Sequence, residues 1–145
     1  MKRILIIDDS PLVIEAVREA LAPDGILVDE LSDAAELERV QLDDFALILC
    51  DVHLPAIFGE DVAGTMRRRT RTSAPIVLLS SLPEAELAAR ARASGLDGYI
   101  LKERGVDVLV DEVRAWLEGR RQRLAARTSR ATTPIPLSLQ PGPGY

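Results

Sequence analysis

The sequence predicts an α/β domain in which a parallel β-sheet carries helices on both faces. Two observations support this prediction: five short apolar runs recur along residues 1–119, and segments of helical periodicity separate them. The runs are rich in Ile, Leu and Val and are unbroken rather than alternating, which is typical of strands covered on both faces. Strands that alternate with helices in this way indicate successive βα units.

Each apolar run is short enough to be a strand rather than a helix. In chain order the expected strands are Ile4–Ile7, Ile26–Val28, Phe45–Cys50, Ile76–Leu79 and Tyr99–Leu101. Right-handed crossovers leave few topologies for such a sheet, but periodicity alone does not give the order of the strands.

Five helices are expected between and after these strands. Ser10 and Pro11 supply an N-cap and a first-turn proline to the first helix, and Ser32 can cap the second. The third ends in three arginines, which suit a helix C-terminus, and the fourth opens at Pro83 and stops at Gly95. Their apolar positions are Leu12, Ile14, Val17 and Leu21; Ala35, Leu37 and Val40; Val62, Thr65 and Met66; Leu87, Ala88 and Ala91; and Val106, Leu109, Val110, Val113, Trp116 and Leu117.

Charge divides the chain into an acidic body and a basic tail. Residues 1–119 hold 13 Lys and Arg against 23 Asp and Glu, a net charge of −10, whereas residues 120–145 hold five Arg and no acid. We expect one domain over 1–119 and an Arg- and Pro-rich, disordered tail over 120–145. The overall charge of −5 argues against DNA as a partner.

Cysteine usage and hydropathy predict a cytoplasmic protein. Cys50 is the only cysteine, so no intramolecular disulfide can form, and we expect it to be a buried strand residue. The N-terminal apolar run is too short for a signal peptide, and no run approaches the ~20 apolar residues that span a bilayer. No membrane partner is expected.

Polar residues gather where the expected strands end. Ligands of open parallel sheets bind outside the carboxyl ends of the strands. Asp8 and Asp9, Asp51, Ser80 and Lys102 follow four of those ends. The second strand would end in Asp29-Glu30, which we expect at the rim of the site.

The charges of this group predict a magnesium site that accepts phosphate. Three carboxylates and one ammonium leave a net charge of −2 in a partly desolvated cleft, which a divalent cation would offset. An all-oxygen site suits Mg²⁺. Ser80 and Lys102 are suitable phosphate partners, which makes Asp51 a candidate acceptor of a phosphoryl group.

Four segments at these strand ends resemble the response-regulator receiver domain. They are Ile4–Ser10, Leu49–Pro55 with Gly59, Pro75–Ser81 and Gly95–Lys102, and together they place the resemblance over roughly residues 2–118. The resemblance implies a flavodoxin-like (CheY-like) fold, with five parallel strands in the order 2-1-3-4-5.

The resemblance also implies a role for each site residue. Asp51 would be the phosphoacceptor; Asp8, Asp9, Asp51 and the backbone carbonyl of His53 would hold Mg²⁺; Lys102 and Ser80 would contact the phosphoryl group; and Ser80 and Tyr99 would form the switch. His53 and Leu82 occupy variable positions beside the phosphorylation site, and the apolar Leu82 favours slow self-dephosphorylation.

The implied function is two-component signalling. A histidine kinase or phosphotransfer protein would supply the phosphate, and phosphorylation would control binding to a downstream protein, without an attached output domain. No enzyme activity is implied beyond self-phosphotransfer and self-dephosphorylation. Dimerisation through the fourth and fifth βα units is common in the family, and this chain gives no decisive sign of it.

One departure from the family pattern and two alternatives complete the prediction. Glu103 follows Lys102 where the family usually has proline; a cis bond there would cost about 2.5–4 kcal/mol, so we expect a trans bond and a differently shaped loop.

Two alternative functions are weighed against the receiver. The first is a hydrolase of the haloacid-dehalogenase type, which is disfavoured because its chemistry needs an Asp as general acid at the position that His53 occupies. A pseudo-receiver that acts independently of phosphorylation is disfavoured by the complete set of acids, hydroxyl and lysine, and is kept open by Glu103.

Overall fold

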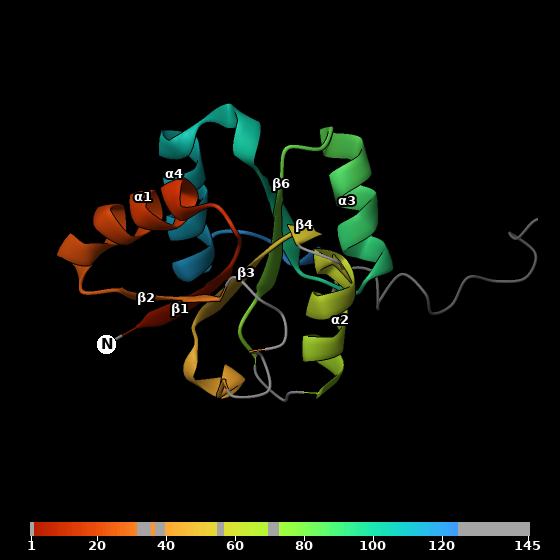
Figure 1. Ribbon diagram of the computed structural model, residues 1–145, viewed down its shortest axis with the longest axis horizontal. Coiled ribbons are helices and arrows are strands. Elements are labelled where there is room, and N and C mark those ends of the chain that lie inside the picture. The colour runs from red at the N-terminus through yellow and green to blue at the C-terminus, as the bar shows by residue number, and fades with distance from the viewer. Residues whose placement is uncertain (1, 32–35, 37–39, 55–56, 70–72, 125–145) are drawn as a thin grey trace, which may run out of the picture.

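The computed structural model describes residues 2–31, 36, 40–54, 57–69 and 73–124 (Figure 1). Five parallel strands form its main sheet, in the order β2-β1-β3-β6-β7. They are β1 (Arg3–Ile7), β2 (Leu27–Leu31), β3 (Leu47–Asp51), β6 (Ile76–Ser80) and β7 (Gly98–Leu101). If the five strands of this sheet are numbered 1 to 5 in chain order, their order is 2-1-3-4-5, as predicted for the flavodoxin-like fold.

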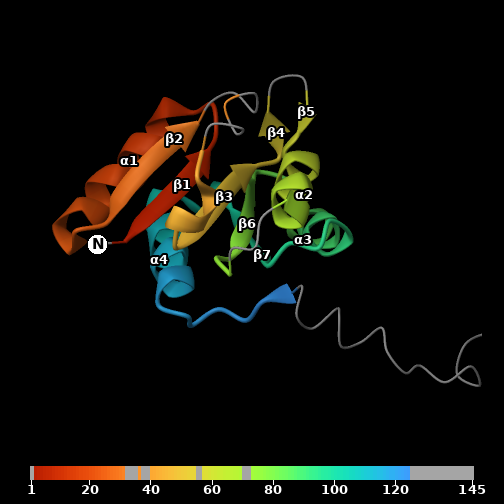
Figure 2. The same cartoon turned by 90° about the horizontal axis from the view of Figure 1, so that it is seen from below.

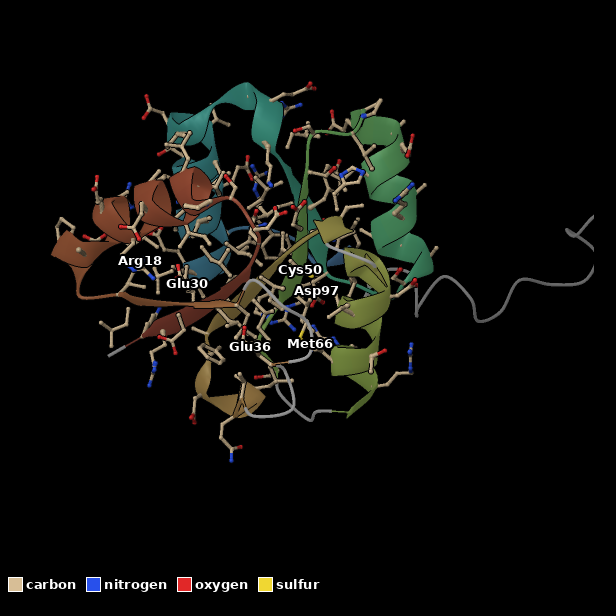
Figure 3. All side chains as sticks on the ribbon, in the orientation of Figure 1. Arg18, Glu30, Glu36, Cys50, Met66 and Asp97 are labelled. Atoms are coloured by element: carbon tan, nitrogen blue, oxygen red, sulfur yellow. The ribbon has the colours of Figure 1, made fainter. Side chains whose placement is uncertain are left out.

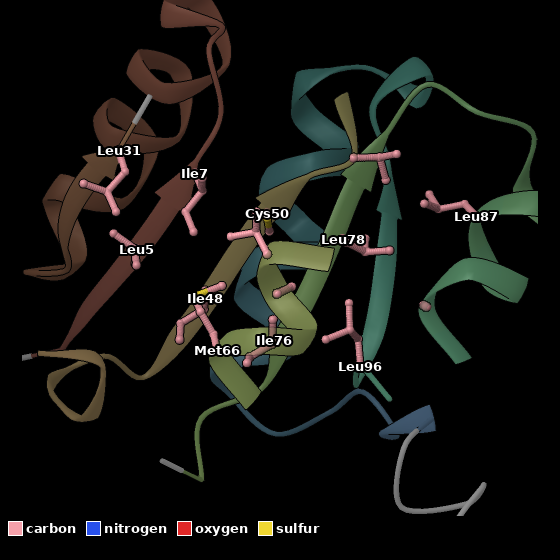
Figure 4. Packing of buried hydrophobic residues seen from close by; sticks show 14 of the residues in the cluster. Leu5, Ile7, Leu31, Ile48, Cys50, Met66, Ile76, Leu78, Leu87 and Leu96 are labelled. Atoms are coloured by element: carbon pink, nitrogen blue, oxygen red, sulfur yellow. The ribbon is translucent and has the colours of Figure 1, made fainter. Parts of the chain in front are cut away.

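Among the described residues, two helices pack on each face of the sheet (Figures 1 and 2). On one face lie α1 (Pro11–Leu21) and α4 (Val106–Leu117), and on the other lie α2 (Gly59–Arg69) and α3 (Glu84–Ala93). Alternate residues of each strand therefore enter different halves of the core. Figure 4 shows the half on the α2/α3 face, where residues of the central strands meet Met66 and Leu87 from the two helices.

Local capping sets where α1 begins. The hydroxyl of Ser10 accepts a hydrogen bond from the backbone N–H of Val13 at 3.4 Å, and Pro11 occupies the first turn of α1, as predicted. Short 3₁₀ turns in the described part of the chain include η1 (Ala22–Asp24), η3 (Leu42–Asp44) and η4 (Lys102–Arg104). The helix expected from the Ser32 cap lies largely outside the described residues.

The strand β2 extends further than predicted, and the expected position of Asp29-Glu30 at the rim of the site is wrong. Both residues lie inside the strand, where Asp29 pairs with Leu5 and Glu30 with Ile6 of β1. Because β2 is an edge strand with a partly solvated surface, it can contain polar residues. The prediction ended this strand where the apolar run ended, and so placed its end too early. Figure 3 shows Arg18 of α1 reaching toward Glu30, 3.4 Å away.

A small hairpin that the sequence did not predict follows Asp51. It pairs β4 (His53–Leu54) with β5 (Ile57–Phe58) in antiparallel register and leads directly into α2. A hydrogen bond of 2.8 Å from the N–H of Gly59 to the carbonyl of Val52 closes its base. A Cβ atom at position 59 would stand 1.6 Å from the carbonyl oxygen of Asp51, so only glycine fits there.

The chain folds back under the sheet after α4. Figure 2 shows this segment crossing the amino ends of β6 and β7. Arg123 donates a hydrogen bond to the carbonyl of Ser73 at 2.6 Å, and the backbone N–H of Leu124 donates one to Asp97 at 2.7 Å. The side chain of Leu124 is 9% exposed and belongs to the core. The expected disorder of the tail concerns mainly residues 125–145, which lie outside the described part of the chain.

None of the helices in the described residues combines the length and apolarity that a membrane crossing requires.

Candidate functional site

Three predicted carboxylates come together at the carboxyl edge of the sheet. Asp8 follows β1 and Asp51 ends β3, and these neighbouring strands run in parallel with Ile7 opposite Cys50. The register therefore brings the two acids side by side. One oxygen from each of Asp8, Asp9 and Asp51 lies within 4.8 Å of the others.

The three acids differ in burial. Asp8 and Asp51 are 0% and 4% exposed, whereas Asp9 stands at the surface. Two inner carboxylates and one outer carboxylate make an oxygen cluster with one open side. This donor set fits a hard divalent cation such as Mg²⁺, which binds few carboxylates and retains water on its remaining positions.

Lys102 joins the two inner carboxylates. It stands at the start of η4, directly after β7, and its Nζ lies 2.8 Å from Asp8 Oδ2 and 3.3 Å from Asp51 Oδ2. The strand β6 lies between β3 and β7 in the sheet, so the lysine reaches across the end of β6 to make these contacts. The predicted convergence of Asp8, Asp51 and Lys102 is present.

Backbone donors hold the opposite oxygens of the same acids. The N–H of Ser10 donates to Asp8 Oδ1 at 2.8 Å, and the N–H of His53 donates to Asp51 Oδ1 at 3.2 Å. Each inner carboxylate thus has one oxygen fixed by its own loop and the other directed to Lys102. The side chain of His53 is exposed, in agreement with its predicted place at the rim.

The electrostatics of the site leave it short of positive charge. Burial raises the pKa of Asp51 above its usual value, and the neighbouring charge of Asp8 raises it further, against the opposing effects of Lys102 and the His53 N–H. Burial lowers the pKa of Lys102, but its hydrogen bond to Asp8 and the charges of both acids outweigh burial and raise it. Lys102 is therefore a permanent cation that does not fully balance the carboxylates.

Ser80 lies where the sequence placed it, at the carboxyl end of β6 and fully buried. Its Oγ accepts a hydrogen bond from the backbone N–H of Leu82 at 3.0 Å. A hydroxyl that accepts this bond still has its own proton to donate. Because β6 lies between the strands that carry Asp51 and Lys102, this donor stands between the two residues along the edge of the sheet.

Tyr99 takes part in a surface contact that the sequence did not reveal. Its hydroxyl donates to Glu84 Oε2 at 2.9 Å, and the other oxygen of Glu84 lies 3.1 Å from Arg104. Burial of the ring, followed by the hydrogen bond and charge of Glu84, raises the pKa of the Tyr99 phenol. Glu84 lies 15 positions from Tyr99 and 20 positions from Arg104, so no local spacing could have indicated this link.

The peptide bond after Lys102 agrees with the expectation for Glu103. The peptide bonds of the described residues are all trans, and η4 forms a tight turn closed by a hydrogen bond from Gly105 N–H to Lys102 carbonyl at 3.2 Å. Gly105 has a φ of 99°, a conformation that glycine adopts readily. Glu103 is exposed, and Lys102 reaches both acids without the usual proline.

The fold and this edge cluster define an α/β domain of the receiver class. The chain belongs to the response regulator family, because residues 4–114 match the family model described as the response regulator receiver domain. Members of the family are signalling phosphoacceptors of two-component systems rather than classical enzymes, and they bind Mg²⁺ at the acidic pocket.

Curated relatives are longer than the matched region. The C4-dicarboxylate transport transcriptional regulatory protein DctD of Pseudomonas aeruginosa is 31% identical over 129 residues, which cover 88% of this chain and 28% of DctD. The DNA-binding dual master transcriptional regulator RpaA of Synechocystis is 34% identical over 148 residues, which cover 97% of this chain and 60% of RpaA. The chain thus spans between about a quarter and three fifths of these two relatives.

Solved structures give the same fold. Response regulator TrrA of Thermotoga maritima, in complex with Mg²⁺ and BeF, is 29% identical with a TM-score of 0.65, over 80% of this chain and 99% of TrrA. A complex of histidine kinase ThkA with TrrA matches at 30% identity and a TM-score of 0.66, over 81% of this chain and 99% of the matched chain. The Vibrio cholerae chemotaxis protein CheY4 matches at 25% identity and a TM-score of 0.68, over 79% of this chain and 97% of CheY4.

Proposed function

We propose that this chain is a Mg²⁺-dependent phosphoacceptor that takes a phosphoryl group on Asp51 from a histidine kinase or a phosphotransfer protein. The observation that carries the proposal is the joint position of Lys102 between Asp8 and Asp51, with three carboxylates within 4.8 Å of one another. A structural ion pair would need one acid for one lysine. The surplus of negative charge favours binding of a divalent metal ion, which in turn can offset the charge of an incoming phosphoryl group.

The residues divide the chemistry among themselves. An oxygen of Asp51 forms a bond to phosphorus while the bond between phosphorus and the donor breaks, and the donor atom keeps that electron pair. Asp8, Asp9, Asp51 and the carbonyl of His53 would hold Mg²⁺, which supplies charge neutralisation to the transferring group. Lys102 changes partner from the Asp51 carboxylate to an oxygen of the new acyl phosphate, and Ser80 donates its proton to another.

The switch would connect this site to Tyr99. If Ser80 moves toward the phosphoryl group, its hydrogen bond with the N–H of Leu82 is lost and the loop before α3 rearranges. That loop leads to Glu84, which holds the hydroxyl of Tyr99 in the unphosphorylated protein. Release of this contact would let the ring change its burial, which gives a two-state element that phosphorylation can bias.

The proposal also covers the protein's partners and the lifetime of the phosphorylated state. The complex of ThkA with TrrA supports a histidine kinase as the phosphodonor, and a downstream protein would read the phosphorylated state. The half-buried, apolar Leu82 beside the site provides no group to orient an attacking water, which favours slow self-dephosphorylation. A cytoplasmic location and a homodimer formed through the fourth and fifth units remain predictions.

The decisive experiment is intact mass measurement of the full chain after incubation with Mg²⁺ and acetyl phosphate, beside the Asp51→Asn variant. We expect one added phosphoryl group on the wild type and none on the variant. Beryllofluoride with Mg²⁺ serves as a control for an adduct that hydrolyses quickly. If the wild type forms no adduct and beryllofluoride has no effect while Mg²⁺ binds, the protein is a pseudo-receiver instead.

A further inference from the structure

The strand β7 has one free edge. It is the last strand of the sheet, and among the described residues it pairs only with β6. The backbone groups on its other side therefore have no strand partner in that part of the chain. An unpaired strand edge of this kind is a template on which another extended segment can form hydrogen bonds.

A groove of about 260 Å³ runs along this edge. All four residues of β7 line it, together with side chains from α3, from η4 and α4, and from the chain that follows α4. The walls are formed by Glu84, Arg104, Val108, Glu112, Trp116 and Leu124, among others. Glu84 forms an ion pair with Arg104 and Glu112 forms one with Arg121, so the walls carry little net charge. The groove suits a neutral, apolar segment.

Trp116 adds a polar group beside the groove. Its ring packs so closely against Gly98 that a Cβ atom there would lie 2.2 Å from the ring. The side chain is 6% exposed, and its Nε1–H has no acceptor among the described residues. A backbone carbonyl of a segment seated in the groove, with a small adjustment of the ring, would supply one.

The chain itself leads to this groove. Leu124 is the last described residue, it lines the groove, and its N–H donates to the carbonyl of Asp97, the residue immediately before β7. Twenty-one residues, 125–145, follow it. The nine residues 125–133 could span about 30 Å, which is more than the roughly 13 Å length of a four-residue strand.

The pattern of residues 134–139 matches an edge strand. Its sequence is Pro-Ile-Pro-Leu-Ser-Leu, with apolar Ile135, Leu137 and Leu139 at every second position and no charged side chain from 131 to 145. In an extended segment, the N–H groups of alternate residues point to opposite sides. Pro134 and Pro136 therefore remove N–H groups from one side only, and the other side can still pair with a neighbour.

We propose that residues 134–139 of this chain add to the free edge of β7 as a sixth strand and fill the groove. The odd-numbered residues pair with β7, and one carbonyl of the segment accepts from Trp116 Nε1. Because Tyr99 lies on β7 and lines the groove, the added strand covers the side chain that the proposed switch moves. The proposal itself does not depend on phosphorylation, so it can be tested without Mg²⁺ or a phosphodonor.

The test compares Leu137→Asp with Ser138→Asp in the full chain. Both variants introduce the same charge into the same segment, one residue apart. Only residue 137 is one of the odd-numbered residues that are proposed to pair with β7. Trp116 is the only tryptophan of the chain, so its fluorescence and its quenching by acrylamide report on the groove directly. Hydrogen exchange of the outward-facing amides of β7 reports on strand addition.

In the wild type and in Ser138→Asp we expect the outward amides of β7 to be protected and Trp116 to be shielded. In Leu137→Asp we expect exchange of those amides to be about tenfold faster and quenching of Trp116 to be about twofold stronger. Equal behaviour of the wild type and Leu137→Asp would overturn the proposal, as would an equal effect of Ser138→Asp. Protection that disappears on dilution would show that the segment of another copy, not the chain's own, occupies the groove.

Discussion

Buried aspartates at the two ends of the sheet show opposite electrostatic arrangements. At the amino end, Asp97 is 4% exposed, forms an ion pair with Arg67 and accepts a hydrogen bond from the N–H of Ile76 at 2.8 Å (Figure 3). At the carboxyl end, Asp8 and Asp51 share one cation, Lys102, among the residues that the structure describes. The amino end is balanced, and the carboxyl end is not.

This difference indicates that the charges at the amino end stabilise the fold, whereas the charges at the carboxyl end serve to bind a ligand. A buried charge with a full set of partners holds two segments together and has nothing left to offer a ligand. Arg67 links Asp97 to the carbonyl of Ala74 and so ties α2 to the segments that lead into β6 and β7. A surplus of like charge lowers stability but leaves oxygens available for a metal ion. Removal of an aspartate charge should therefore lower stability at the amino end and raise it at the carboxyl end.

The largest effect is expected at the balanced end. Asp97→Ala leaves Arg67 and the N–H of Ile76 without their shared acceptor, and should lower the free energy of unfolding by about 3 kcal/mol. Chemical denaturation measures the change. The matched control is Asp29→Ala, which breaks an exposed pair with Arg3 at 2.6 Å and should cost no more than about 0.5 kcal/mol. Similar losses in the two variants would contradict the comparison.

Removal of Lys102 should have the next largest effect. Lys102→Ala leaves three carboxylates without a cation and should destabilise the Mg²⁺-free protein by about 1–2 kcal/mol. The same variant should bind Mg²⁺ several-fold more tightly, because the metal no longer competes with an ammonium. Titration calorimetry checks the affinity, and weaker binding of Mg²⁺ would show that the lysine organises the metal site instead of opposing it.

Asp51→Asn should stabilise the Mg²⁺-free protein by about 1 kcal/mol at neutral pH, because it removes one of the repelling charges. The sign follows from the raised pKa of Asp51 in the folded state. Such a group contributes stability below its unfolded pKa, near 3.8, and this contribution is lost as the pH rises through the folded pKa. The gain from Asp51→Asn should therefore grow over that pH window in denaturation curves, and a constant gain would argue against the electrostatic cause.

The smallest effect is expected at Tyr99. Glu84→Gln removes the charge that helps to raise the pKa of the phenol, so the pKa should fall toward its usual value. Stability from the neutral phenol is present below about pH 10 and is lost as the pH rises through the folded pKa. Tyr145 is the only other tyrosine, so absorbance at alkaline pH in a Tyr145→Phe background follows Tyr99 alone. An unchanged titration would mean that the contact with Glu84 is not maintained in solution.

The carboxyl end was more predictable from the sequence than the amino end. Asp8, Asp51, Ser80 and Lys102 each follow an apolar run, and parallel strands bring such positions to one edge whatever their separation in the chain. Asp97 also precedes a predicted strand, but nothing in its spacing indicates Arg67, 30 residues away. The extent of β2 was missed because solvation of an edge strand depends on its place in the sheet.

The sequence by itself determined the strand–helix alternation, the family and the set of residues at the carboxyl edge. These features depend on local periodicity and on the direction of each strand. Tertiary structure alone decided that Lys102 joins Asp8 to Asp51, that Glu84 holds Tyr99, and that Leu124 returns to the core beneath β7. Each of these contacts joins distant segments whose distances are set by packing of the sheet and helices, and no spacing along the chain encodes that packing.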